Sequence, residues 1–327
     1  MAPPNRTALA RLDTPLMALP RLGREIGVAL WVKRDDMTGS VMGGNKVRKL
    51  EYVIADALAQ GADTLITCGG TQSNHCRATA IACAQLGLRA HLVLAGNSLD
   101  HPDGNLLLDC LAGATITLVS PELFGTALNA EIETIAATER RAGHKPYVVP
   151  LGASFEPGLW GYIGAVAELK ADCAKEGFSP EILAFATGSG GTQGGLVLGN
   201  AMYGLGARIV GYSVASEASD LGARVRAQMR QWQARYGQNI DVDSLPVEID
   251  DRTVGAGYGQ ADDAVFETIA RVGKLEGLIL DPVYTGKAMH GLLTDLSHGK
   301  LKGARNAVFL HTGGVFGIFP QRGNFSA

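Results

Sequence analysis

Short apolar runs rich in β-branched residues alternate along this chain with longer stretches of helical periodicity. The predicted strands are 63–68, 89–94, 115–119, 146–150, 182–187, 208–214 and 306–310. The predicted helices are 46–60, 74–86, 127–143, 191–203, 220–236, 262–273 and 286–298. Strands that alternate with helices are typical of βαβ units, so the pattern predicts an α/β fold with open, parallel sheets.

The length of the chain predicts two lobes. Its 327 residues are about twice the ~150 that serve as a prior for one domain. No single linker divides the chain, so we expect the second lobe to be inserted into the first. The expected large domain comprises residues 1–46 and 160–327, and the expected smaller α/β domain comprises residues 47–159.

Composition narrows the possible partners. The formal net charge is −3, and the basic residues are scattered rather than interleaved with aromatic residues, so we expect no nucleic-acid partner. Residues 1–13 lack an apolar core segment, and no later apolar run approaches the ~18 residues of a membrane span. We therefore expect a cytoplasmic protein that binds a small molecule and has no membrane partner.

The cysteines predict neither disulfides nor a metal site. The five form an odd, widely spaced set without a CxxC pair, which is typical of reduced and mostly buried thiols. They are Cys68, Cys76, Cys83, Cys110 and Cys173.

The first candidate motif is the string GGNK at 43–46, which opens a predicted helix. A lysine at a helix start lies near the positive end of the helix dipole, and Arg48 and Lys49 add positive charge, so we expect a lowered pKa for Lys46. A lowered pKa is what a lysine needs to form a Schiff base. Alone, the string more often marks a glycine turn followed by a solvated lysine.

The second motif is GGTQSNH at 69–75, a turn between a predicted strand and a predicted helix. Such a turn points backbone N–H groups at an anion, here suitably the carboxylate of a substrate. The expected substrate-binding residues are Thr71, Gln72, Ser73 and Asn74. Ser73 and Asn74 equally fit as helix caps, and His75 is expected to pack or cap rather than act as a base.

The third motif is TGSGGTQGG at 187–195, again a strand, a glycine turn and a helix. Its backbone donors, with the hydroxyls of Ser189 and Thr192, can bind a phosphate dianion. A plain strand-to-helix turn and a dinucleotide site are the alternatives. The dinucleotide alternative is weaker because no well-placed acidic residue follows about 20 residues on.

Three further side chains can carry chemistry. The phenols of Tyr258 and Tyr284 can move protons or orient a substrate if a nearby cation lowers their pKa. Each is otherwise a packed tyrosine whose hydroxyl has a partner. Thr312, after the apolar run at 307–310, either ends that strand or contacts a heterocyclic ring nitrogen.

Taken together and in order, six strings resemble the D-cysteine desulfhydrase and 1-aminocyclopropane-1-carboxylate (ACC) deaminase family. They are GGNKVRK, GGTQSNH, TGSGGTQ, GYG, DPVYTGK and HTGG, and the resemblance spans about 14–317. It implies the tryptophan-synthase-β-like fold called fold type II, with two α/β lobes and pyridoxal 5′-phosphate (PLP) between them. It also implies a homodimer.

The resemblance assigns roles to individual residues. Lys46 matches the Schiff-base lysine, and Asn74 matches the asparagine beside the phenolic oxygen of the cofactor. Ser73 matches a serine that contacts the substrate and in some members acts as a nucleophile or proton carrier. Tyr258 and Tyr284 match two active-site tyrosines. The residues that match phosphate-contacting positions are Lys49 and Thr187, Gly188, Ser189, Gly190, Gly191 and Thr192.

Two positions indicate the branch of the family. ACC deaminases carry a glutamate after the DPVY tyrosine and a leucine before the late Gly-Gly, whereas this sequence has Thr285 and Thr312. Hydroxyls beside the pyridine nitrogen leave it largely neutral, which suits β-elimination of a good leaving group. The resemblance therefore implies a carbon–sulfur lyase that converts D-cysteine to pyruvate, ammonia and sulfide.

Several alternatives stay open at this point. L-Cysteate sulfo-lyases share these strings, and a sulfonate calls for an extra cation, which Arg77 or His75 would supply. ACC deaminase, β-replacement and racemase activities use the same scaffold, and a phosphate- or PLP-binding regulator is the alternative outside enzymes. The apolar tail at 315–319 departs from the small residues that we expect after HTGG.

Overall fold

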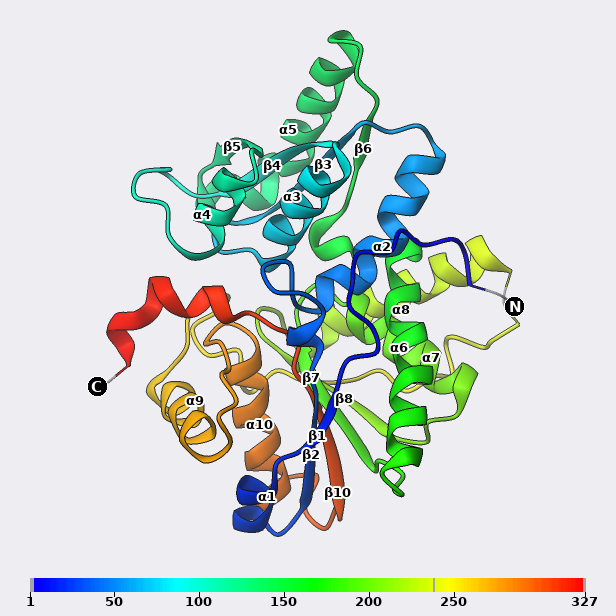
Figure 1. The fold of residues 1–327 in the computed structure, drawn as a ribbon, viewed down its shortest axis with the longest axis vertical. Coiled ribbons are helices and arrows are strands. Elements are labelled where there is room, and N and C mark those ends of the chain that lie inside the picture. The colour runs from blue at the N-terminus through cyan, green and yellow to red at the C-terminus, as the bar shows by residue number, and fades with distance from the viewer. Residues whose placement is uncertain (1–2, 238, 326–327) are drawn as a thin grey trace.

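The computed structural model describes residues 3–237 and 239–325, whose strands form two sheets (Figure 1). Within these residues the larger sheet has the order β1–β2–β10–β7–β8–β9. Its strands are β1 (Leu16–Ala18), β2 (Ala29–Lys33), β10 (Asn306–Leu310), β7 (Ile182–Thr187), β8 (Arg208–Ser213) and β9 (Glu248–Asp250). Strand β1 pairs with β2 in the antiparallel direction, and the other neighbours pair in parallel.

The smaller sheet is parallel and has the order β5–β4–β3–β6. Its strands are β5 (Thr115–Val119), β4 (Arg89–Ala95), β3 (Thr64–Gly70) and β6 (Pro146–Val148). All of them fall inside the range predicted for the inserted domain, and they form the upper lobe in Figure 1. The predicted α/β fold with open parallel sheets is confirmed, while the domain boundaries at 46/47 and 159/160 remain a prediction.

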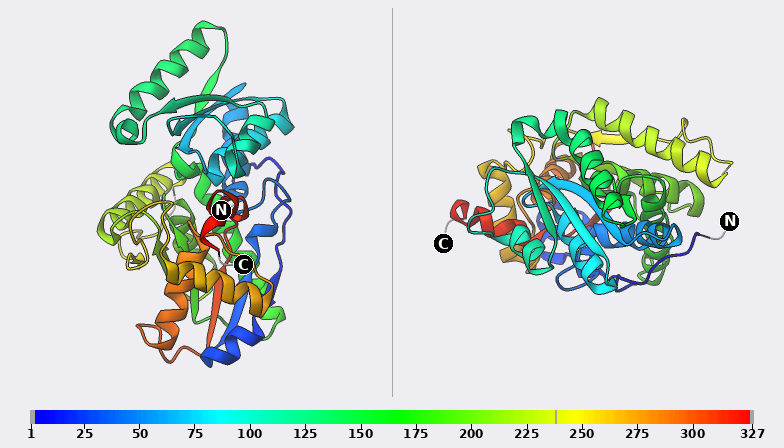
Figure 2. Two further views of the ribbon diagram at one scale, coloured as in Figure 1. Left: turned by 90° about the vertical axis from the view of Figure 1, so that its left-hand side faces the viewer. Right: turned by 90° about the horizontal axis from the view of Figure 1, so that it is seen from above.

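Helices cover both sheets (Figure 2). They are α1 (Pro20–Ile26), α2 (Asn45–Ala59), α3 (Asn74–Leu86), α4 (Gly104–Leu111), α5 (Pro121–Arg141), α6 (Glu156–Lys175), α7 (Gly191–Tyr203), α8 (Ala218–Tyr236), α9 (Asp263–Glu276) and α10 (Thr285–Ser297). Three 3-10 segments are η1 (Asp35–Met37), η2 (Leu151–Ala153) and η3 (Val315–Asn324). The predicted helices agree with α2, α3, α7 and α10 to within about a residue. The prediction missed α1, α4 and α6.

Helices pack on both faces of the larger sheet, and successive side chains of a strand point to opposite faces, so neighbouring residues enter different clusters. On one face, Ala184 of β7 and Phe309 of β10 pack in a cluster with Leu292 of α10. On the other face, Phe185 of β7 belongs to a cluster with Trp160 of α6. This doubly covered arrangement explains why these strands read as continuous apolar runs.

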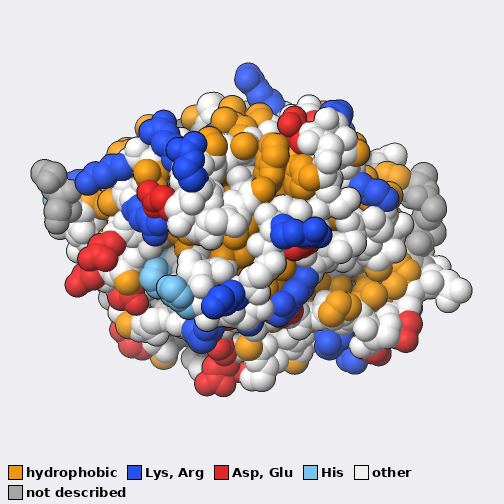
Figure 3. All heavy atoms as spheres, turned by 90° about the horizontal axis from the view of Figure 1, so that it is seen from below, with side chains coloured by type: hydrophobic (Ala, Val, Ile, Leu, Met, Phe, Trp, Pro, Cys, Tyr) orange, Lys and Arg blue, Asp and Glu red, His pale blue; other side chains and the backbone are white. Residues whose placement is uncertain are grey.

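The surface carries charges of both signs, which are interspersed on the face seen from below in Figure 3. The five cysteines are free thiols, four of them buried and Cys110 exposed. Within the described ranges, none of the helices has both the length and the apolar character needed to cross a bilayer.

Candidate active site

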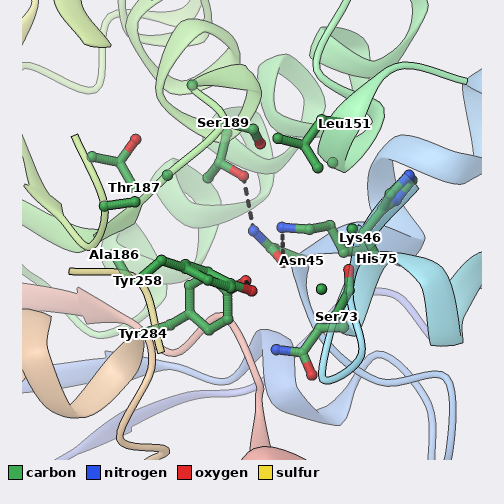
Figure 4. A pocket seen from close by; sticks show the side chains of 18 of the residues that line it. Asn45, Lys46, Ser73, His75, Leu151, Ala186, Thr187, Ser189, Tyr258 and Tyr284 are labelled. Atoms are coloured by element: carbon green, nitrogen blue, oxygen red, sulfur yellow. Dashed lines mark hydrogen bonds between the residues drawn. The ribbon is translucent and has the colours of Figure 1, made fainter. Parts of the chain in front are cut away.

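A pocket of about 280 Å³ opens where the carboxyl ends of strands from both sheets meet. Open α/β sheets place ligand sites at this edge. Gly70 ends β3, Thr187 ends β7, and Thr312 follows β10. Figure 4 shows the side chains of Lys46, Ser73 and the two tyrosines around this space.

Eleven of the residues predicted from the sequence line this pocket. They are Lys46, Ser73, Asn74, Thr187, Gly188, Ser189, Gly190, Thr192, Tyr258, Tyr284 and Thr312. Five others do not line it: Lys49, Thr71, Gln72, Gly191 and Thr285. Their surroundings explain why.

Lys46 lies in the first turn of α2, which begins immediately after Gly44. Gly44 has φ +122°, and a Cβ on it would stand 2.9 Å from the carbonyl oxygen of Thr312, so the tight approach of these two segments requires glycine here. The Nζ of Lys46 donates to Oδ1 of Asn45 at 3.2 Å and lies 5.9 Å from the ring centre of Tyr284. The ammonium group of Lys46 therefore lies between the side chain of Asn45 and the ring of Tyr284.

Burial and the charge of Arg77 together lower the pKa of Lys46 to about 8, against the opposing charge of Asp281. The direction agrees with the sequence-based expectation. The expected contribution of Arg48 is not supported, because its guanidinium donates to Asp35 and Glu168 in a buried network. The charges of Lys46 and Lys49 do act on each other, and Arg77 is a further cation that lowers the pKa of Lys46.

Lys49 lies behind the glycine loop rather than on the pocket wall. Its Nζ donates to the carbonyl oxygen of Gly152 and, at 3.2 Å, to the hydroxyl of Ser154. That hydroxyl in turn shares a 2.7 Å hydrogen bond with Ser189 and accepts the N–H of Gly191 at 3.2 Å. Lys49 thus supports the loop at 187–192 through Ser154 instead of contacting a ligand.

The glycine loop leads into the N-terminus of α7, where first-turn N–H groups and the helix dipole favour an anion. Gly190 has φ +92°, and a Cβ on Gly191 would lie 2.6 Å from the Ser154 hydroxyl. Thr192 accepts the amide N–H of Asn45 at 3.0 Å. The hydroxyl of Thr187 is buried without a hydrogen-bond partner. The loop therefore brings one unpaired hydroxyl, that of Thr187, together with the start of a helix at the pocket wall.

The sequence allowed two roles for the segment 71–74, substrate binding and helix capping, and its residues differ in which role they take. Ser73 is the N-cap of α3, and its hydroxyl accepts the N–H of Cys76 at 3.2 Å while it also lines the pocket. Gln72 turns away, because its side chain donates to Asp103 and accepts the N–H of Asn105. The prediction that Thr71 and Gln72 contact the substrate is not supported by their positions.

Tyr258 and Tyr284 lie side by side on the pocket wall, with ring centres 5.8 Å apart in an edge-to-face arrangement (Figure 4). Their hydroxyls share a hydrogen bond of 2.5 Å. Desolvation raises the pKa of both phenols, that of Tyr258 to about 12, and the hydrogen bond from Tyr284 partly opposes the rise at Tyr258.

Of the two threonines that mark the branch, the structure places only Thr312 on the pocket wall. Thr285 is fully buried, and its hydroxyl donates to Oδ1 of Asp281 at 2.7 Å and accepts the N–H of Asp281 at 2.8 Å. It secures the start of α10 by holding Asp281. The expectation that Thr285 contacts the cofactor ring is therefore unsupported.

Neither side chain that we considered for a sulfonate is a free cation in the pocket. Arg77 is buried and does not line it. His75 lines it, but burial lowers the pKa of its imidazole well below the usual value, and Nε2 shares a 2.7 Å hydrogen bond with Thr67. The guanidinium on the wall is that of Arg224, from α8.

Several residues that line the pocket, Arg224 among them, were not predicted from the sequence. Asn45 lies inside the GGNK string, so its neighbour Lys46 could have drawn attention to it. Leu151, Phe124 and Arg224 lie in segments with no local motif, and only the fold brings them to the pocket. They had no signal that a single sequence could reveal.

These features fit PLP, which needs three things from its site. Its aldehyde needs a buried amine of lowered pKa, which is present. Its phosphate needs donors such as a helix N-terminus with nearby hydroxyls, and its ring needs polar groups on the wall; both are present. The sequence pattern of the family described as pyridoxal-phosphate dependent enzymes matches residues 7–313. The chain therefore belongs to this family of PLP-dependent enzymes, and the predicted cofactor is confirmed.

Similar proteins indicate which branch of this family the chain resembles. It is 37% identical to the D-cysteine desulfhydrase of Salmonella choleraesuis, over 96% of this chain and 95% of that protein. It is 38% identical to the mitochondrial bifunctional D-cysteine desulfhydrase/1-aminocyclopropane-1-carboxylate deaminase of Arabidopsis thaliana, over 98% and 80% of the two chains. A crystal structure of an ACC deaminase homologue superposes with a TM-score of 0.87 at 37% identity, over 98% and 94%. The predicted family and the fold type II architecture are confirmed.

Proposed function

We propose that this protein is a PLP-dependent carbon–sulfur lyase that eliminates the β-substituent of a small amino acid, with D-cysteine as the substrate. The products are pyruvate, ammonia and sulfide. The observation that carries the proposal is the character of the pocket wall, on which Thr312 is present and no aspartate or glutamate is found among the described residues. A hydroxyl beside the pyridine nitrogen suits a substrate with a good leaving group.

In this proposal the residues of the pocket have distinct tasks. Lys46 holds the cofactor covalently and, once released, takes the α-proton, for which an amine of pKa about 8 is suited. The loop 187–192 and the start of α7 bind the phosphate, and Lys49 supports that loop. When bound, PLP withdraws electrons from the α-carbon of the amino acid.

The remaining wall residues act on the substrate. Ser73 contacts its carboxylate, and Asn74 contacts the phenolic oxygen of the cofactor. The pair Tyr258 and Tyr284 delivers or removes a proton, or Ser73 does so for the opposite configuration at the α-carbon. These assignments follow from the family resemblance together with the places of the residues on the wall.

L-Cysteate is the second candidate substrate, and one observation favours it. Arg224 brings a guanidinium to the pocket wall, where its Nη1 contacts the carbonyl oxygen of Gly188 at 3.5 Å. A guanidinium can pair with a departing sulfonate. Arg77 and His75 do not compete for this role. Arg77 does not line the pocket, and burial lowers the pKa of the His75 imidazole, which favours its neutral form.

A substrate panel tests the proposal. The holoenzyme is incubated with D-cysteine, L-cysteine, L-cysteate and ACC, and pyruvate, sulfide, sulfite and 2-oxobutyrate are measured. We expect pyruvate and sulfide in equal amounts from D-cysteine, and none from the Lys46→Ala variant. Sulfite from L-cysteate with a higher kcat/KM would establish the second candidate, and 2-oxobutyrate from ACC as the main product would overturn the proposal.

We also propose that the enzyme is a cytoplasmic homodimer, as the family resemblance implies. Sedimentation equilibrium of the holoenzyme tests the first part, with twice the chain mass of 34.2 kDa as the expected result. A monomer at micromolar concentration would contradict it. Cell fractionation tests the second part, with the activity expected in the cytosolic fraction.

A further inference from the structure

Arg77 is the largest fully buried charged side chain near the pocket, although it does not line it. It lies in the first turn of α3 and is 1% exposed. Its Nη1 donates to Oδ1 of Asn105 at 2.9 Å and to Oδ1 of Asn74 at 3.2 Å, and its Nη2 donates to the carbonyl oxygen of Gly43 at 2.7 Å. The guanidinium also lies 5.0 Å from the ring centre of Phe316.

These contacts determine which way the amide of Asn74 points. A guanidinium has donors only, so the Asn74 atom that it contacts is the amide oxygen. Nδ2 of Asn105 donates to the same oxygen at 3.1 Å. With its oxygen held twice from behind, Asn74 presents its N–H donors to the pocket that it lines.

The third contact concerns the segment that carries Lys46. The carbonyl of Gly43 belongs to the turn three residues before Lys46, and this turn is packed so closely that a Cβ on Gly43 would meet the carbonyl oxygen of Gly39 at 2.4 Å. Arg77 therefore connects α3 of the smaller sheet to the loop that starts α2. One side chain holds the positions of two groups of the pocket.

The cost of burying this charge argues against a purely structural role. Among the described residues Arg77 forms no ion pair, and its contacts are to neutral oxygens. Burying an uncompensated cation is unfavourable. The buried carboxyl of Asp109 in α4 acts on Arg77 through its charge, but neither of its oxygens accepts a hydrogen bond from the guanidinium, and Nε of Arg77 is also without a hydrogen-bond partner. The positive charge of Arg77 consequently remains to act on Lys46.

We propose that Arg77 is a positioning residue of the active site, which fixes the Asn74 amide with its N–H groups toward the cofactor and holds the Gly43 turn that carries Lys46. The inference rests on the proposed function only in so far as PLP binds in this pocket. It names no new catalytic group, because Arg77 does not touch the pocket.

A double-mutant cycle tests the proposal. Arg77→Met, Asn74→Ala and the double variant are compared for the visible absorption spectrum of bound PLP, the Kd of PLP for the apoprotein, and kcat/KM. Each single variant is expected to change the spectrum and to lower kcat/KM by about tenfold or more. If Arg77 acts through Asn74, the double variant is no worse than Asn74→Ala beyond the small additional effect on Lys46.

The conservative variant Arg77→Lys separates geometry from charge. Lysine keeps the positive charge but lacks the planar fork that reaches three oxygens, so we expect the altered spectrum of Arg77→Met with a nearly unchanged pH dependence of Lys46. It also carries the test if Arg77→Met does not fold, as judged by circular dichroism. Arg89→Met is the control, because Arg89 begins β4, contacts Glu139 of α5 and does not line the pocket.

Two outcomes would overturn the proposal. Fully additive effects of Arg77→Met and Asn74→Ala on kcat/KM would show that the two residues act independently. Unchanged cofactor spectra and PLP affinity in both Arg77 variants would show that Arg77 serves the fold alone. The spectra and affinities do not depend on which amino acid is turned over, so these outcomes are distinct from failure of the D-cysteine assignment.

Discussion

The hydroxyls of Tyr258 and Tyr284 share a hydrogen bond of 2.5 Å on one wall of the pocket. The two residues come from different segments, and both line the space in front of Lys46. Joined in this way, the two phenols form one unit through which a proton can pass.

Replacement of either phenol should therefore remove most of the function of both. We expect Tyr258→Phe and Tyr284→Phe each to lower kcat by about 10²-fold, in the range usual for loss of a general acid or base. The double variant should be little worse than either single one, because residues that act as a unit are not additive. Steady-state kinetics with D-cysteine measure this, and multiplicative losses would contradict the shared role.

The lowered pKa of Lys46 predicts how fast the apoprotein combines with PLP at different pH values. Only the neutral amine attacks the aldehyde, so the second-order rate should rise with pH through a midpoint of about 8, below the usual lysine value of 10.5. Because the charge of Arg77 lowers this pKa, Arg77→Met should move the midpoint upward. Stopped-flow absorbance checks both, and a midpoint above 10 in the wild-type protein would refute the assignment.

Lys287 should matter for turnover without contacting the pocket. It lies one residue after Gly286 in α10, and its buried Nζ donates to the carbonyl oxygens of Val254 at 2.6 Å and Gly257 at 2.9 Å, which hold the loop that carries Tyr258. We expect Lys287→Met to lower kcat by about tenfold while the Kd of PLP stays unchanged. Lys274→Met, at an exposed position of α9, is the control and should match the wild type. Equal losses in both variants would exclude the positioning role.

Much of the site could be predicted because its chemistry is concentrated in strings that follow strands. The carboxyl ends of parallel strands meet at one edge, so 43–46, 69–75 and 187–195 converge without any knowledge of loop paths. The order of residues along the chain could not reveal which side chains of these segments point into the pocket. Gln72 turns to Asp103 and Lys49 reaches Ser154, partners that lie far along the chain. Thr285 turns to Asp281, which is only four residues away, but the sequence does not show that this carboxylate is buried beside it.

Helices could be predicted where the apolar residues recur with a clear helical period, and were missed where the helix is buried on several sides and shows no such period. Helix α6 was missed because its sequence contains Gly158, Gly161 and Gly164, and it is buried on more than one side, so no apolar stripe stands out. Two of these glycines are explained by contacts that the sequence does not show. A Cβ on Gly158 would lie 2.2 Å from the carbonyl oxygen of Ala153, and one on Gly161 would lie 2.3 Å from that of Arg48.

The same helix supplies a matched pair for a stability measurement. Gly161→Ala should lower the free energy of unfolding by roughly 1–3 kcal/mol or more, because its Cβ forces α6 away from α2. At Gly164 a Cβ meets nothing within 4 Å, so Gly164→Ala should raise that free energy by about 1 kcal/mol through helix propensity. Urea denaturation of both variants measures this. Equal effects of the two substitutions would contradict the close packing of α6 on α2.

The most direct test of the account is the visible absorbance of the protein with PLP, before and after borohydride reduction and peptide mapping. The wild-type protein should show a band in the visible range and, after reduction, a stable cofactor adduct on Lys46. The Lys46→Ala variant should lack both the band and the adduct and should release no pyruvate. A wild-type protein that stays colourless with PLP, or a Lys46→Ala variant that keeps full turnover, would contradict the account.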